Sequence, residues 1–399
     1  MNSLLLAADT AGYTTPPTWR VLTKTGYFVG LSGAIGATVT YATTVRPSLR
    51  SARRTGDPGD AAVLRSRSAA FLAWAGLVLL LAGYFQLAGR VARAGKGMAF
   101  GDALAPGAIL DFLRAPTAKG AWIAQGDVYT AQNLVLLAAA AALLALFAPP
   151  VRRHVDRIAL AALPAALAVT LIGAVPATAP ADLDRWLDLL LNQVHIISGT
   201  VWLGGLALLV ALAGTRGRLG DGAGALWADV WRRFSLVAMV CVGAVLLSGL
   251  WLSWKHVGAV SQLWTTGYGI ALLAKVLLVL GLVAAGAFNQ FWLMPRIARA
   301  RRADDTASLR HLTLRHFPLV VWGEVVLGLA VLAVVPFITG SARAEAGSAK
   351  AVSSGSLFAA GAAMALALAV SLYATAKASD ALSRRAPAAP AAPTTPAAA

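Results

Sequence analysis

The sequence predicts an all-α fold, a polytopic membrane bundle of about nine transmembrane helices. Of its 399 residues, 58% are hydrophobic and only 13% are charged, whereas a soluble domain carries about 25% charged residues. The apolar residues form blocks of about 18 to 25, the length that a helix needs to cross a hydrocarbon core of about 30 Å. The two-residue alternation of a membrane barrel is absent, which leaves helices as the spanning structure.

The apolar blocks define nine candidate spans, 21–45, 69–89, 129–148, 158–175, 189–213, 234–255, 268–292, 318–339 and 357–376. We group the first four spans into an amino-terminal region, 21–176, which follows an outer segment, 1–20. The next four spans form a second domain, 185–340, and the ninth stands alone. The outer segment has neither the basic start nor the long apolar stretch of a cleaved signal peptide, so we expect none.

Basic residues predict the orientation, because cytoplasmic loops carry an excess of Lys and Arg. One side holds 22 of the 34 Lys and Arg residues, in the loops 46–68, 149–157, 214–233 and 295–317 and in the tail after the ninth span. The opposite side holds 10, and two lie within spans. We therefore expect the N-terminus outside and the C-terminus in the cytoplasm of a bacterial inner membrane. The same clustering accounts for the net charge of +17, so we expect a lipid bilayer and no nucleic acid as partner.

Two segments outside the spans have their own character. The long outer loop 90–127 interleaves apolar and polar residues, which favours a short interfacial or re-entrant helix. The tail 378–399 ends in APAAPAAPTTPAAA, a composition that cannot form a packed core and predicts disorder. The single cysteine, Cys241, excludes an intrachain disulfide.

Ionisable residues inside the spans are the first candidates for function, because each costs about 2.5–3.5 kcal/mol to insert. Span five contains His195, span seven Lys275 and span eight Glu324. Lys24 and His256 lie at the outer ends of spans one and six, where their polar ends reach water at low cost.

His195 opens a helical face in the segment NQVHIISGTVWLGG. Ser198, Gly199, Trp202 and Gly205 follow at helical spacing on the same face, so that small residues admit a neighbouring backbone. The imidazole lies about 9 Å below the outer end of its span. We interpret it as a metal ligand or proton carrier, with Trp202 supporting the pathway. The alternative is a hydrogen bond to a neighbouring helix that only fixes packing.

Glu324 lies about 9 Å from the cytoplasmic end of span eight, and Asn289 of span seven lies at similar depth. Together they predict an inner acidic station for a cation or proton. A helix-to-helix hydrogen bond made by a protonated carboxyl is the alternative.

Lys275 lies about 10 Å below the outer end of span seven, close in depth to His195. A charged ammonium there would repel a cation held by the imidazole. Either desolvation keeps this lysine neutral, or it pairs with Asp184 or Asp188 from the preceding outer loop.

Met239 and Cys241 carry soft sulfur atoms of the kind that select Cu(I), and Met239 is a further candidate ligand. Two positions apart, they point about 200° away from each other on a helix, and filling core gaps is the alternative. His154, His311 and His316 lie among arginines in cytoplasmic loops, where solvated side chains are expected. The motifs of common soluble enzymes are absent, so we expect neither an enzyme nor catalytic residues.

Several segments between 185 and 340 carry a family resemblance. They are His195 with VWLGGL (201–206), RRFSLVAMV (232–240), LLSGLWLS (246–253), TTGYGIALLAKVLLV (265–279), FNQFWLMPR (288–296) and Glu324. In this order and spacing they resemble the copper-resistance D (CopD) family of bacterial inner-membrane proteins. Gln290 stands where the family pattern leads us to expect a basic residue.

The resemblance implies copper transport toward the cytoplasm, contributing to copper homeostasis or resistance. Copper, the transported or transiently bound species, would arrive at His256 and His195 and leave past Glu324 and Asn289. The chain lacks Met- and His-rich outer segments, so a periplasmic copper-binding protein is an expected partner. The alternative is a non-transporting factor that hands copper to a membrane oxidase. Haem needs two histidines at matched depth, and none is expected.

Overall fold

The computed structural model describes residues 13–55, 58–95, 97–180, 182–220, 223–349, 351 and 354–384. Within this part of the chain the fold is helical and contains no strand, which confirms the all-α class. Nine helices in it are long and apolar enough to cross a membrane, Thr18–Ala52, Pro58–Ala94, Gln125–Phe147, Val155–Ile172, Leu183–Ala213, Ala223–His256, Gly267–Arg302, Thr306–Phe337 and Gly355–Ala378. The predicted number of spans is therefore confirmed, and most of the helices extend beyond the predicted ends.

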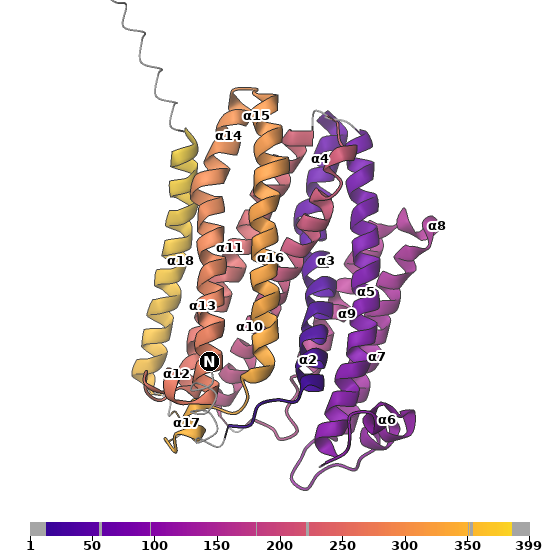
Figure 1. The fold of residues 1–399 in the computed structure, drawn as a ribbon, viewed down its shortest axis with the longest axis vertical. Helices are drawn as coiled ribbons and strands as arrows, with labels where there is room; N and C mark the ends of the chain where they lie inside the picture. Colours follow the sequence, from indigo (N-terminus) through magenta and orange to yellow (C-terminus); the bar gives the residue numbers. More distant parts are fainter. Residues whose placement is uncertain are drawn as a thin grey trace, which may run out of the picture.

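The amino-terminal group packs four of these helices together (Figure 1). Its first helix is continuous but contains two π turns, with one extra residue in each hydrogen-bonded turn. The elements of the group are α2 (Thr18–Leu31), η1 (Ser32–Gly36), α3 (Ala37–Thr40), η2 (Tyr41–Val45), α4 (Arg46–Thr55), α5 (Pro58–Ala94), η3 (Asp102–Leu104), α6 (Pro106–Leu113), α7 (Gln125–Leu144), η4 (Ala145–Phe147), α8 (Pro149–Arg152) and α9 (Val155–Ile172).

The second group contains the remaining five long helices (Figure 1). Two of them also contain π turns, η6 and η7. The elements are α10 (Leu183–Ala213), η5 (Arg216–Arg218), α11 (Ala223–His256), α12 (Gln262–Thr265), α13 (Gly267–Phe288), η6 (Asn289–Leu293), α14 (Met294–Arg302), α15 (Thr306–His311), η7 (Leu312–His316), α16 (Phe317–Val334), η8 (Val335–Phe337), α17 (Ala342–Glu345) and α18 (Gly355–Arg384).

Two ends of the bundle can be distinguished. Figure 1 places α4 and α15 at one end and α6, α12 and α17 at the other. We call the end with α4 and α15 the basic end, because it carries the loops 46–68, 214–233 and 295–317 that are rich in arginine. The segregation of loops agrees with the predicted alternation.

Short polar caps fix where the long helices begin at the end opposite the basic end. Asp182 accepts a hydrogen bond from the Arg185 N–H (2.8 Å) at the start of α10. Thr266 accepts one from Gly269 at the start of α13, and the Glu345 carboxylate accepts another from Gly267 (2.8 Å). A side-chain oxygen in these positions satisfies the backbone N–H groups that a helix start leaves unpaired.

Tyr13 ties the segment before α2 to the second group. Its hydroxyl donates a hydrogen bond to the Phe337 carbonyl (2.7 Å), and its ring packs where a side chain at Gly267 would stand. Burial and the negative charge of Glu345 raise the pKa of this hydroxyl, so it stays protonated and able to donate at neutral pH. The rest of the predicted outer segment 1–20 before Tyr13 lies outside the described residues.

The outer loop 90–127 does contain a short helix, α6. Its Ile109 packs with Leu87 and Val91 of α5 in a small apolar cluster. The helix therefore lies against the end of α5, supported by its own core.

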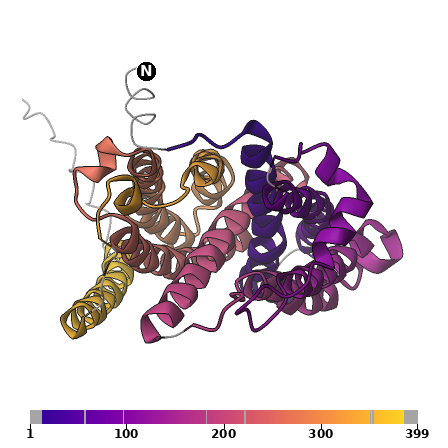
Figure 2. The same cartoon turned by 90° about the horizontal axis from the view of Figure 1, so that it is seen from below.

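Helix α10 joins the two groups. Seen from the end opposite the basic end, it runs obliquely between them (Figure 2). A Cβ on Gly204 would lie 1.7 Å from the Ser32 carbonyl oxygen, and a Cβ on Gly36 would lie 2.1 Å from the Thr200 oxygen. Backbone therefore touches backbone, which only small residues permit. We call this contact of η1 with α10 the glycine seam.

Helix α18 lies at the edge of the bundle against α11 and α14 (Figure 1). No residue of its apolar stretch is fully buried. It extends to Arg384, so residues 378–384 are helical where we expected disorder. The remainder of the predicted tail, from 385 onward, lies outside the described residues.

Candidate functional site

His195 lies where three helices of the second group meet. From α10, its Nδ1 lies 3.1 Å from the Ser248 Oγ of α11, and its Nε2 lies 3.2 Å from the Lys275 Nζ of α13. Gly249 makes room beside the ring, because a Cβ there would already lie 3.4 Å from the imidazole Cε1. The predicted closeness in depth of His195 and Lys275 is a direct contact in the structure.

The hydrogen bonds around His195 indicate which ring nitrogen carries the proton. The Ser248 hydroxyl donates to the Ala244 carbonyl in its own helix (2.5 Å), so its oxygen is left to accept from the Nδ1–H of His195. In a neutral imidazole the lone pair then lies on Nε2. That atom faces the Lys275 Nζ, so the one position at which this imidazole can bind a metal is covered by an amine.

Of the two alternatives for Lys275, the pairing with Asp184 or Asp188 is wrong. Both carboxylates instead contact Lys255 of α11, which follows the His195 partner Ser248 by seven residues, about two turns; the Asp188 contact is 3.6 Å. Trp251 also donates a hydrogen bond to Asp188 (2.8 Å). The carboxylates lie in the first two turns of α10, too near its end to reach the depth of Lys275.

His256 does not join His195 in one site. Its Nδ1–H donates to the Leu252 carbonyl (2.7 Å), and its ring stacks on Tyr268 with centroids 5.6 Å apart. It follows the His195 partner Ser248 by eight residues, about 12 Å along the axis of α11. Two metal–nitrogen bonds of about 2 Å cannot cover that separation.

Glu324 and Asn289 do form a pair, as their predicted depth suggested. Asn289 Nδ2 donates to the Glu324 Oε1 (2.9 Å), and the two side chains are 8% and 3% exposed. Asn289 is the first residue of the π turn η6, and its Oδ1 is buried without a hydrogen-bond partner. π turns are frequent at functional sites, and an unsatisfied amide oxygen beside a carboxylate is a suitable ligand for a cation.

The structure thus has two polar sites: His195 with Lys275, which we call the His195 station, and Glu324 with Asn289, which we call the Glu324 station. They are far apart along one helix. Lys275 and Asn289 belong to the same continuous helix and are 14 positions apart, which corresponds to about 21 Å along its axis. The His195 station is therefore nearer the end with α12 and α17, and the Glu324 station is nearer the basic end.

The remaining candidates do not join either station. Trp202 and Cys241 are buried in the main hydrophobic core, and Met239 precedes Ser248 by nine residues, about 13 Å along α11. Among the described residues no group of three or more His, Cys, Asp or Glu side chains could hold a metal ion. Each station thus offers few ligands.

The loop histidines differ in one respect from expectation. His311 and His316 are exposed, as predicted, but their rings are in edge contact with centroids 4.6 Å apart. Their five-residue spacing is poor on an α-helix, but the π turn η7 (Leu312–His316) brings residues five apart together.

Two contacts were not anticipated from the sequence. Ser248 orients His195, and Ser235 donates a hydrogen bond to the Gln290 Oε1. For Ser248 the usable signal was a single small polar residue within a long apolar stretch, VLLSGLWL. Such a residue in lipid needs a partner on the same or a neighbouring helix.

Comparison with known proteins bears on this site. The family model "Copper resistance protein D" (CopD) matches residues 228–338. The chain is also 33% identical over 127 residues to the "Copper transport protein CutJ" of Bacillus subtilis (strain 168). The chain carries a CopD-family region. No solved structure matches it significantly.

The CopD match contains most of the two stations. Ser248, Lys275, Asn289 and Glu324 lie within it, whereas His195 lies on α10, ahead of the matched residues. The alignment with the Bacillus relative covers 32% of this chain and 22% of that protein, so the chain matches about a fifth of the relative's length. The family model and the relative are both named for copper, and both are similar to part of this chain only.

Proposed function

We propose that this protein carries copper across the bacterial inner membrane toward the cytoplasm and so contributes to copper homeostasis or resistance. The observation that carries the proposal is the His195 imidazole inside the bundle, beside Ser248 and Lys275; from the hydrogen bonds of Ser248 we infer that the lone pair of the neutral ring lies on Nε2. An imidazole nitrogen is a good ligand for copper. The membrane location and the CopD match supply the context.

The direction follows from the positions of the stations. If the basic end faces the cytoplasm, as the distribution of Lys and Arg predicts, copper meets His256 and then His195 from the periplasmic side. It leaves past Asn289 and Glu324 near the cytoplasm. Few ligands at each station suit a transported ion, because conduction requires binding weak enough for release. A periplasmic copper-binding protein would supply the ion, and copper is cargo rather than a cofactor of an enzyme.

In this proposal Lys275 blocks access of copper to the Nε2 atom of His195. Its Nζ lies 3.2 Å from the Nε2, so copper reaches that nitrogen only when the lysine side chain moves aside. Copper and the amine compete for one lone pair, and the station is closed when no copper is present.

Lys275→Leu should therefore raise the affinity of the purified protein for Cu(I) by about fivefold or more, because a charged Lys275 about 4 Å from the ion would repel it by about 1 to 4 kcal/mol. Competition with a colorimetric Cu(I) chelator measures the affinity. Adding His195→Ala to this variant should remove the gain. An unchanged affinity in Lys275→Leu would show that the lysine does not cover the site.

Uptake of copper tests the inner station. Copper-depleted bacteria producing the protein should accumulate copper above cells with an empty vector, and Glu324→Gln should lower that gain by about tenfold, the lower range for loss of a metal-site partner. Glutamine still accepts the hydrogen bond from Asn289 but has no negative charge. Elemental mass spectrometry of washed cells, at equal membrane abundance, measures the result.

Asp111→Asn is the matched control, since it removes an exposed carboxylate from α6. If Glu324→Gln transports as well as the wild type, Glu324 only holds the helices together. If the wild type itself does not raise cellular copper, the transport proposal fails.

The alternative is delivery of copper to a membrane oxidase without transport. The outer loop favours it, because Met98, Leu110 and Trp122 expose large apolar surfaces there that a partner protein would cover. In that case deletion of the protein lowers the copper content of the oxidase while total cellular copper stays constant.

A further inference from the structure

A large basic pocket lies at the basic end, away from both copper stations. It is formed where the turn η5 faces the helix that begins at Thr306, and its volume is about 880 Å³. Arg216 contributes from η5, and Arg310, His311 and Arg315 contribute from α15 and η7. The copper proposal makes no use of these residues.

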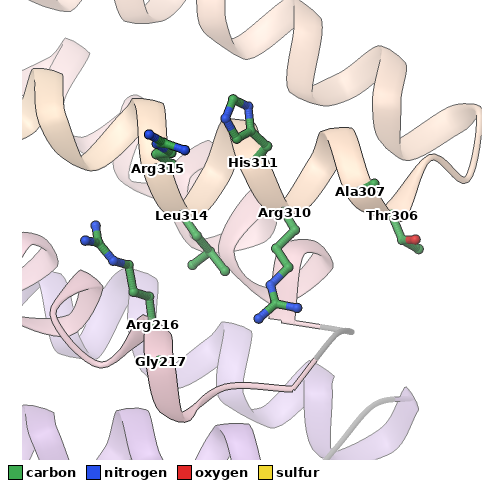
Figure 3. A pocket seen from close by; sticks show the side chains of 8 residues that line it. All are labelled: Arg216, Gly217, Thr306, Ala307, Arg310, His311, Leu314 and Arg315. Carbon is green, nitrogen blue, oxygen red and sulfur yellow. The ribbon is translucent and has the colours of Figure 1, made fainter.

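The arginines approach the pocket from both walls. Figure 3 shows Arg216 reaching from η5 toward the helix and Arg310 reaching from the helix toward η5. Neither Arg216 nor Arg315 forms an ion pair with a carboxylate among the described residues. Asp305, at the start of α15, accepts a hydrogen bond from the Ser308 N–H. Positive charge around such a space favours an anion, and guanidinium groups match the geometry of phosphate.

An apolar stripe continues from the pocket along α16. Leu319, Trp322 and Val326 follow Arg315 at intervals of four, three and four residues, so they share its face of the helix. Their side chains are 64%, 55% and 54% exposed. In a membrane this stripe faces lipid chains, directly below the arginine.

We propose that the pocket binds a phosphate group, supplied by the headgroup of an anionic phospholipid whose acyl chains lie along this stripe of α16. The basic walls and the apolar stripe together match a molecule with a charged head and a hydrocarbon tail. Basic pockets between transmembrane helices on the cytoplasmic side bind anionic headgroups in this way. Free inorganic phosphate shares the charge but cannot use the stripe.

The test uses the purified full-length protein in detergent, with phosphatidylglycerol, phosphatidylcholine or inorganic phosphate added at equal concentrations. Native mass spectrometry counts the lipids retained, and the thermal unfolding midpoint reports the stabilisation. Phosphatidylglycerol should be retained and should raise the midpoint, whereas the other two should not. Arg216→Gln with Arg315→Gln should weaken the binding by about fivefold for each arginine removed.

Arg153→Gln with Arg157→Gln is the control, since both arginines are exposed at the same end but outside the pocket. If this control loses as much lipid as the pocket variant, binding reflects general surface charge and the proposal is overturned. If inorganic phosphate stabilises the protein as well as phosphatidylglycerol does, the pocket is a free-phosphate site and the lipid assignment is overturned.

Discussion

Replacing His195 with alanine is expected to bring copper accumulation down to the level of cells that lack the protein. Among the described residues, the imidazole is the group that we propose to bind copper at the meeting point of α10, α11 and α13, and alanine leaves no nitrogen ligand between Ser248 and Lys275. The loss should be about 10-fold to 100-fold, at least the range for altered metal-site partners. Copper uptake into depleted cells, at matched membrane abundance, measures it.

Alanine variants of His154 and His256 test whether the loss of transport is specific to His195. His154→Ala changes a residue in the loop before α9 and should transport normally, whereas His256→Ala should slow uptake only at low external copper. Ser248→Ala removes the acceptor that orients the ring and should give an intermediate loss. Full uptake by His195→Ala would reduce this residue to a packing role, the alternative that its position also allows.

The second large effect is expected at the glycine seam. Gly204→Ala should destabilise the protein by about 3 kcal/mol, the upper part of the range for overpacking, because the added Cβ would lie 1.7 Å from the Ser32 carbonyl oxygen. A carbonyl oxygen in the opposing backbone cannot turn aside as a side chain can. The thermal unfolding midpoint in detergent and the amount of protein in the membrane should both fall.

Gly199 provides a control on the same helix, since no heavy atom lies within 4 Å of a Cβ built there. Gly199→Ala should leave the midpoint unchanged or raise it slightly, because alanine favours the helix over glycine. Equal behaviour of the two variants would contradict the tight contact at Gly204.

Sequence reasoning predicted the spans well because lipid imposes a strict requirement on length and polarity. It did not predict the π turns, such as η6 at Asn289, because they depend on packing between helices. At the site, depth along each helix was predictable from the rise per residue, so Glu324 with Asn289 and His195 with Lys275 were placed at matching levels. The pairing of Lys275 with Asp184 or Asp188, one of two alternatives, fails because α10 begins at Leu183 and already holds both carboxylates in its first two turns, at the level of Lys255.

At the glycine seam, too, the sequence does not predict which face of α10 contacts a neighbouring helix. The face shared with His195 predicts the close approach at Gly199 and Gly205, but the closest approach is made by Gly204, on the face turned toward η1. The signal available was the cluster of small residues in SGAIG at 32–36, which offers a matching surface on another helix.

The glycine seam also limits how a path could open alternately to the two sides of the membrane. The backbones of η1 and α10 are in direct contact at the glycine seam. Helix α10 therefore cannot move against the amino-terminal helices without breaking that contact. Alternating access would then come from movement of α13, η6 and α16, which carry Lys275, Asn289 and Glu324, against a fixed α10. The amino-terminal helices and α10 would stay fixed while α13, η6 and α16 move. His195, on α10, would then keep its position during transport.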